Sequence, residues 1–284
     1  MTAEASGMKQ KKHREAVDWW KEIRGAGWLI LLVLAFHSLI AKPFFIPSGS
    51  MLSTLYIGDR LVVNKFAYGW SWASPSFRIL PEMEGRLLGR LPTPGDVVIV
   101  KPPGSYSDFI KRVIALPGDS VGVENGVVWL NGRPLPKQEV EPAMMPVSEN
   151  MPCNSYRYEQ YLVTGPDGRQ YCRVPRYRET LPNGRSYETL DLGPSPEDDF
   201  GPIIVPEGHI FLMGDNRDDS ADSRIDSQNG GLGPIPVGNI GGRAEFITFS
   251  LDGSFRLLNP LSWAGAVRGG RTGTTLHPHE QGAE

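Results

Sequence analysis

The sequence has little of what nucleic-acid or zinc binding requires. Its 284 residues carry 29 Lys and Arg against 32 Asp and Glu, a formal net charge of -3. No basic excess is present to neutralise phosphates, which disfavours a nucleic-acid-binding protein. Two cysteines and five histidines are too few and too dispersed for a zinc site, and only His209 lies in the body of the chain. We expect no metal or organic cofactor.

Long stretches of helical periodicity are also missing after the N-terminal region. The 33 Gly and 25 Pro favour short strands joined by turns. Asn-Gly pairs at Asn125-Gly126 and Asn131-Gly132 sit between apolar runs and predict hairpins. The segment "GGRAEFITFSLDG" predicts a closing strand pair, and residues 70–91 a long loop. We predict an all-β fold with a small β-barrel-like core of antiparallel strands and an inserted β subdomain.

One long apolar run, "GAGWLILLVLAFHSLIA", occupies residues 25–41 and predicts a transmembrane anchor over 25–42. At about 17 residues it is at the short end of what spans a bilayer core. A single Lys42 follows the run, whereas six basic residues precede it, which are Lys9, Lys11, Lys12, Arg14, Lys21 and Arg24. The positive-inside rule therefore predicts a single-pass protein of the cytoplasmic membrane, with a cytoplasmic tail over 1–24 and the rest outside. A cleaved signal peptide and a buried core helix are the alternatives.

Composition divides the exported part into a core and an insertion. Residues 122–205 are polar and rich in Tyr, Pro and Glu, and we interpret them as the inserted β subdomain. Residues 43–121 and 206–268 form the predicted β core, and 269–284 a flexible C-terminal tail. Cys153 and Cys172 both lie in the insertion. Export would permit a disulfide between them, and the sequence leaves this pairing open.

A nucleophile is the chemical question raised by "PFFIPSGSMLSTL", which gathers several hydroxyls just after the apolar run. A serine needs a base to take its proton, and His209 has no orienting motif near it. A lysine can serve if burial keeps it neutral. Lys111 lies in "FIKRVI", where apolar residues occupy both strand faces. The alternation leaves open whether Lys111 or Arg112 points inward, and two surface cations on an edge strand are the simpler reading.

The densest polar cluster is "GDNRDDSADSR", residues 214–224. A calcium loop is excluded by ligand spacing, because Arg217 and Ser220 occupy positions that need a ligand and a glycine. A surface turn with Asx hydrogen bonds is one interpretation. A paired network that orients a catalytic group is the other.

Four blocks in order give the sequence a family resemblance. They are "PSGSMLSTLYIGDRLVVNKFAYG" (47–69), "GDVVIV" (95–100), "DFIKRVIALPGD" (108–119) and "GDNRDDSADSR" (214–224). Together, behind one anchor, they resemble the bacterial type I signal peptidases. The resemblance implies a membrane-anchored serine endopeptidase that removes signal peptides from exported preproteins after small residues in an Ala-x-Ala pattern. Its partners would be those preproteins and the lipid bilayer.

The resemblance also implies roles for individual residues. Ser50 would be the nucleophile, Lys111 the general base, and Ser48 a donor to the oxyanion with the Ser50 amide. Ser220 would orient the lysine. The remaining residues would support the site or bind substrate: Asp222 and Arg224 as a structural ion pair, Asp108 and Ile110 on the substrate-pairing strand, and Phe44, Ile46, Met51, Leu55 and Ile110 as apolar pocket walls.

Two features depart from the family pattern. Ser53 stands where the family usually has proline, and residues 225–242 form a longer connection than is usual. Two other functions are compatible with the sequence: a non-catalytic envelope scaffold, and a Ser/Lys peptidase dedicated to maturing a conjugation-type system. The sequence does not separate a general from a specialised enzyme.

Overall fold

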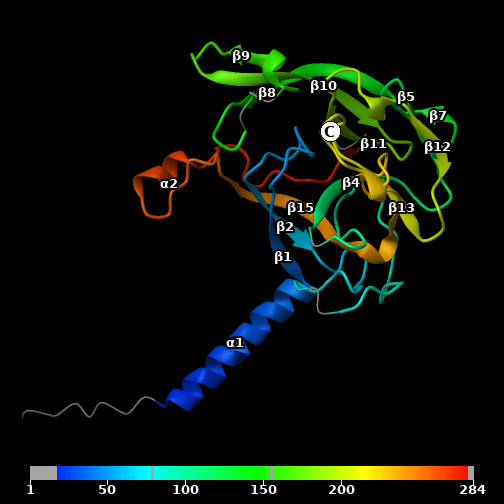
Figure 1. Cartoon of the computed structure of the whole chain (residues 1–284). Coiled ribbons are helices and arrows are strands. Elements are labelled where there is room, and N and C mark those ends of the chain that lie inside the picture. The colour runs from blue at the N-terminus through cyan, green and yellow to red at the C-terminus, as the bar shows by residue number, and fades with distance from the viewer. Residues whose placement is uncertain (1–17, 78–79, 106, 152, 154–155, 281–284) are drawn as a thin grey trace, which may run out of the picture.

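An apolar helix and a β-rich body make up the computed structural model, which describes residues 18–77, 80–105, 107–151, 153 and 156–280. Helix α1 spans Trp19–Leu39, and the Asp18 carboxylate caps it by accepting from the backbone N–H groups of Trp20 and Lys21 at 3.2 and 3.3 Å. Figure 1 shows α1 projecting away from the sheets. Among the described residues α1 is the one helix long and apolar enough to cross a membrane.

The helix differs in its limits from the predicted anchor. It begins earlier, at the Asp18 cap, and Ala41 and Lys42 already belong to the first strand. Its C-terminal end is fastened to the body, since the indole Nε1 of Trp70 donates to the carbonyl of Leu39 at 2.8 Å. The first four basic residues of the predicted cytoplasmic tail lie outside the described residues.

A seven-stranded sheet forms the core of the body, with every neighbouring pair antiparallel. Its order is β1 (Ala41–Phe45), β2 (Asp59–Asn64), β15 (Ile240–Ser250), β3 (Val97–Val100), β4 (Phe109–Ala115), β13 (His209–Met213) and β14 (Ile235–Pro236). The predicted closing strand pair is instead the single long strand β15. It bridges β2 and β3 and carries register shifts that bend it.

Two smaller sheets come mostly from the predicted insertion. One has the order β16 (His279–Glu280), β11 (Arg185–Leu190), β10 (Gln170–Thr180) and β8 (Lys137–Pro146), with β9 (Leu162–Thr164) also on β10. The other has the order β12 (Phe200–Ile204), β5 (Ser120–Glu124), β6 (Val127–Leu130) and β7 (Arg133–Pro134). Strands β8–β10 lie at the end of the body away from α1 (Figure 1). The predicted all-β fold behind one N-terminal helix is confirmed.

Short helices and one disulfide complete the chain. Helix α2 spans Leu261–Gly265, and the 3-10 helices are Glu159–Tyr161, Pro196–Asp198, Ser227–Asn229 and Val237–Asn239. Cys153 and Cys172 form a disulfide with their Cα atoms 5.7 Å apart. The described part of residues 70–91 contains no strand, as predicted for a loop.

The apolar packing explains how the segment after β1 is held. Met51 and Leu55 are fully buried in one cluster with Ile110, while Leu52 packs into another with Met145. Successive side chains of this segment therefore point into two different cores. The turn between β1 and β2 is thus fixed from both sides.

The C-terminal segment also departs from the flexible tail that its composition predicts. Leu276 is 3% exposed and packs against the seven-stranded sheet, and β16 pairs with β11. Residues 281–284 of the predicted tail lie outside the described residues.

Candidate active site

The side chains of Ser50 and Lys111 meet in the interior. Lys111 Nζ lies 2.7 Å from Ser50 Oγ, although 61 positions separate the two residues. Ser50 is on the turn that follows β1, and Lys111 is on β4. Both are buried, with Lys111 only 2% exposed. The same Nζ donates to the carbonyl of Ile110 at 3.0 Å.

Burial changes the protonation of this amine. It lowers the pKa of Lys111 to about 8, because removing an ammonium from water disfavours its charged form. The carboxylates of Asp222, Asp215 and Asp219 act in the opposite direction, but within the described part of the chain the hydrogen-bond partners of Lys111 Nζ are Ser50 Oγ and the Ile110 carbonyl rather than a carboxylate. The amine is therefore neutral in a substantial fraction of molecules near pH 8.

Strand β4 buries the neighbouring cation too. Arg112 is 2% exposed and forms a two-pronged ion pair with Asp215, Nε–Oδ1 at 2.7 Å and NH2–Oδ2 at 2.6 Å. Its third nitrogen donates to the carbonyl of Gly95 at 2.7 Å. Strand β4 is buried on both faces, so Lys111 and Arg112 both point into the interior. Neither is a surface cation.

Backbone contacts hold the Ser50 turn. Asn216 donates from its backbone N–H to the carbonyl of Ser50 at 3.2 Å and from its side-chain amide to the carbonyl of Gly49 at 3.0 Å. The backbone N–H of Ser50 has no hydrogen-bond acceptor within the described part of the chain. Ser48 is exposed two positions before it. The turn thus carries a backbone N–H without an acceptor at Ser50 and an exposed hydroxyl two residues earlier at Ser48.

The polar cluster after β13 packs behind the turn. A Cβ atom at Gly214 would meet the Ser220 hydroxyl and would lie 2.5 Å from the Ser50 carbonyl oxygen, so glycine is what permits this approach. Ser220 Oγ is fully buried and has no hydrogen-bond partner among the described residues. It bonds neither to Lys111 nor to another side chain there.

Asp222 and Arg224 form a buried ion pair at the base of this cluster. Arg224 Nε and NH2 each lie 3.0 Å from an Asp222 carboxylate oxygen. Burial alone would raise the pKa of Asp222, but Arg224 holds that pKa below its ordinary value. Asp222 also accepts from the backbone N–H of Gly214 at 2.9 Å, so the pair fixes the loop that packs on Ser50.

The residues predicted to bind substrate are divided between surface and interior. Ile46, Met51 and Leu55 are fully buried, so they lie beneath the surface of the site. Ile110 is 4% exposed, and Phe44 and Asp108 are half-buried.

Sequence reasoning missed several residues of this centre. The insertion contributes Glu179, which pairs with Arg217 at 2.7 Å, both side chains being nearly inaccessible. It also contributes Tyr158, whose hydroxyl contacts the side-chain amide of Asn216 at 2.6 Å. Glu179 stands 38 positions from Arg217, and no local pattern links them. The sequence feature that could have indicated this pair is the mixture of acidic and basic residues in "GDNRDDSADSR". It predicts buried ion pairs but does not identify Glu179 as the partner of Arg217.

The site therefore combines a serine hydroxyl and a buried amine on a β-sheet body that follows one apolar helix. The sequence model described as "Signal peptidase, peptidase S26" matches residues 19–249. The chain therefore belongs to the signal peptidase S26 family, which includes the bacterial type I signal peptidases, and is a hydrolase that acts as a peptidase.

Individual relatives extend over most of the chain. Signal peptidase I of Rickettsia typhi is 34% identical over 239 residues, covering 81% of this chain and 80% of the relative. Signal peptidase I of Rickettsia bellii strain OSU 85-389 is 33% identical over 270 residues, covering 89% and 84%. A solved signal peptidase I from Enterococcus faecalis has 19% identity and a TM-score of 0.28, covering 54% of this chain and 97% of that one.

Proposed function

We propose that this peptidase removes signal peptides from exported preproteins with Ser50 as nucleophile and Lys111 as general base. The observation that carries the proposal is the 2.7 Å contact between a hydroxyl and a buried amine whose pKa is lowered to about 8. A buried lysine without a carboxylate partner is costly to a fold. Its retention beside a serine favours catalysis over a purely structural role in an envelope scaffold.

The chemistry requires a neutral Lys111. Its lone pair takes the Ser50 proton as Oγ attacks the scissile carbonyl carbon, forming a tetrahedral intermediate. Collapse breaks the C–N bond, and the lysine ammonium returns the proton to the leaving amine. The neutral Lys111 amine then takes a proton from water, and the water oxygen attacks the acyl carbon of the ester. The ester bond then breaks as the Lys111 ammonium returns that proton to Ser50 Oγ, which gives the signal-peptide carboxyl end and restores the Ser50 hydroxyl.

Three nearby groups support this cycle. The unengaged N–H of Ser50 and the hydroxyl of Ser48 are the proposed donors to the oxyanion, and each such donor typically stabilises a transition state by about 3–4 kcal/mol. The unpartnered hydroxyl of Ser220 is the proposed acceptor for an N–H of Lys111. The Asp222–Arg224 pair is proposed to support the loop that carries Ser220.

Substrate selection is proposed to lie along β4. The extended preprotein would pair with the backbone of Asp108 and Ile110, with small residues at the first and third positions before the cut. The side chains of Phe44, Ile46, Met51 and Leu55 would form or support the apolar walls that exclude larger residues. Residues 43–121 and 206–268 are the proposed catalytic core, 122–205 the inserted subdomain.

The proposed location follows from α1. The helix would cross the cytoplasmic membrane once with the N-terminus in the cytoplasm, so that Ser50, eleven positions after Leu39, lies close to the outer lipid surface. There the end of a preprotein's apolar segment would emerge from the bilayer.

The experiment uses the full chain in detergent or vesicles with an exported preprotein that has an Ala-x-Ala site. Wild type should release a product whose N-terminal sequence begins immediately after that site, and Ser50→Ala should release none. Ser53→Ala is the matched control, because Ser53 is a second hydroxyl on the same turn, and it should keep activity. Equal cleavage by Ser50→Ala and wild type would rule out Ser50 as nucleophile.

A further inference from the structure

Residues 269–280, here termed the C-terminal strap, follow helix α2 and end in the strand β16. They contact the segment between Ser50 and β2 through Arg271, and they end in β16, which pairs with β11. We propose that the C-terminal strap positions the Ser50 turn for catalysis and that Arg271 is the positioning residue. This inference rests on the proposed role of Ser50.

Arg271 binds the turn at two places. Its Nε lies 3.0 Å from Asp59 Oδ1 and its NH2 2.5 Å from Asp59 Oδ2, and Asp59 is completely buried. The same NH2 donates to the backbone carbonyl of Thr54 at 3.0 Å. The guanidinium also stacks over the ring of Tyr56, 3.8 Å from its centroid. One side chain thus joins Thr54, midway between Ser50 and β2, to Asp59, the first residue of β2.

Thr54 links Arg271 to Asp215 and, through Asp215, to strand β4. While Arg271 holds its carbonyl, the Thr54 hydroxyl donates to Asp215 Oδ2 at 2.6 Å. Asp215 is the partner of Arg112, the residue after Lys111. Hydrogen bonds between buried or half-buried groups therefore lead from the C-terminal strap to Arg112, which is next to Lys111 on β4. Leu55 N–H to Met51 O at 2.8 Å carries the same restraint back toward Ser50.

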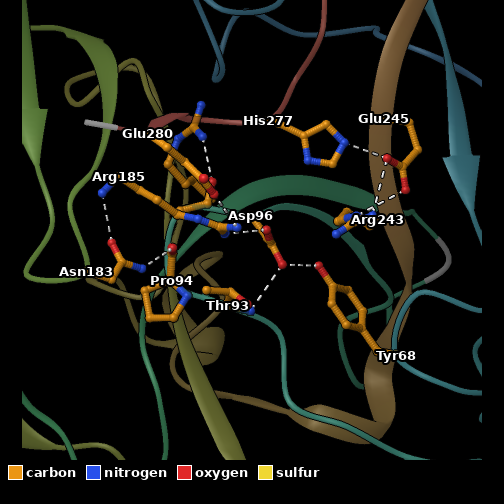
Figure 2. Close-up of polar contacts among 12 residues, drawn as sticks. Tyr68, Thr93, Pro94, Asp96, Asn183, Arg185, Arg243, Glu245, His277 and Glu280 are labelled. Carbon is orange, nitrogen blue, oxygen red and sulfur yellow. Dashed lines mark hydrogen bonds and ion pairs between the residues drawn. The ribbon is translucent and has the colours of Figure 1, made fainter. Parts of the chain in front are cut away.

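The rest of the C-terminal strap is fastened independently of Arg271. Figure 2 shows His277 pointing at Glu245, which also pairs with Arg243, and Arg185 between Asp96 and Glu280. Leu276 is buried beside Met51 and Leu55. The backbone that follows Arg271 is therefore anchored without its guanidinium, as a positioning role requires.

Arg271 contacts neither Ser50 nor Lys111, so its loss should change the placement of the reacting oxygen rather than the chemistry or the binding of substrate. In Arg271→Gln, kcat should fall about 10- to 100-fold with KM unchanged within about twofold, since a displacement of about 1 Å costs rates of this size. Arg271→Lys, which keeps a donor for Asp59 and Thr54, should recover part of kcat. Arg256→Gln, an arginine of the same region in an exposed pair with Glu149, is the control and should match wild type.

Asp59 complicates a single substitution, because removal of Arg271 leaves its buried carboxylate unpaired and lowers the melting temperature. The double variant Asp59→Asn/Arg271→Gln removes that charge while still leaving Thr54 without its donor. Its melting temperature should return toward wild type while kcat stays low. Recovery of kcat together with the melting temperature would show that Arg271 only stabilises the fold, and would overturn the proposal.

The two proposals fail in different ways. Unchanged kcat in Arg271→Gln and in the double variant contradicts the positioning role and leaves Ser50 as nucleophile untouched. Full activity of Ser50→Ala contradicts the nucleophile itself, whatever Arg271 variants do.

Discussion

Lys111 and Arg112 are adjacent in β4, yet both side chains are buried and each has its own partner. Lys111 contacts the hydroxyl of Ser50, and Arg112 forms an ion pair with Asp215. The two faces of a strand point in opposite directions, so the pair connects β4 to two different structures. On one side is the Ser50 turn, and on the other is the polar loop after β13. The catalytic proposal depends on this two-sided burial, because it excludes water from the lysine amine.

Activity should depend on pH through Lys111. Its pKa is lowered by burial to about 8 and the neutral amine is the active form, so kcat/KM should rise as pH increases through about 8. Lys65→Met is the control, because burial lowers the pKa of Lys65 to about 7 and it is a second buried lysine near Asp108. The inflection near 8 should persist in this variant. If the inflection disappeared in Lys65→Met, the pH dependence would belong to Lys65, and this result would contradict the role proposed for Lys111.

The free energy of unfolding should also depend on pH through Lys111, because its charged form is unfavourable in the folded chain. The folded chain releases the Lys111 proton near pH 8, whereas the unfolded chain holds it to about the ordinary 10.5, so the charged amine destabilises the fold below pH 8. Lys111→Met should therefore raise the free energy of unfolding by up to about 3 kcal/mol at pH 7. The gain should shrink as pH rises from 8 to 10.5. Urea unfolding at several pH values measures it, and a gain that is constant with pH would contradict the shifted pKa.

Gly214 should tolerate no side chain. A Cβ there would overlap the Ser220 hydroxyl and the Ser50 carbonyl oxygen, so Gly214→Ala must move the Ser50 turn. We expect kcat to fall about 100-fold, since misplacement of a reacting group by about 1 Å has effects of this size. Gly265→Ala is the control, because nothing lies within 4 Å of a Cβ at that position. The rates at which both variants cleave a preprotein test this. Wild-type activity of Gly214→Ala would show that the close approach of Gly214 to the Ser50 turn is not needed for catalysis.

The insertion should stabilise the core through Glu179. Glu179→Ala leaves Arg217 charged, buried and without its carboxylate, which costs about 3–5 kcal/mol. The exposed pair of Glu149 and Arg256 offers the comparison, and Glu149→Ala should cost no more than about 1 kcal/mol. Chemical denaturation of both variants tests the difference. Equal losses would mean that the buried pair does not join the insertion to the core.

Much of the fold and the central pair could be anticipated from local sequence. Strand runs, turn residues and the apolar helix are short-range signals, and the four family blocks identify Ser50 and Lys111. Local pattern left the orientation of β4 open because a strand buried on both faces has no polar side. It also missed Glu179 and Tyr158, whose partners are distant in sequence.

The C-terminal strap illustrates the same limit. Residues 269–280 are rich in Gly and Thr, with Leu276 as their apolar anchor and Arg271 as the docked charge. One apolar residue in a polar stretch has no periodicity, so composition predicts a loose tail. The contacts that hold it belong to β2, β11 and β15, which only the folded chain brings near.

The central claim is that an uncharged amine at position 111 takes the proton of Ser50, and Lys111→Arg tests it most directly. Arginine keeps the positive charge and similar length but does not lose its proton at any working pH. The measurement is the single-turnover cleavage rate of a preprotein at pH 8 by folded Lys111→Arg and by wild type. We predict a rate lower by at least about a thousandfold, consistent with loss of general base catalysis. Cleavage by Lys111→Arg within tenfold of wild type, at the same peptide bond, would contradict the account.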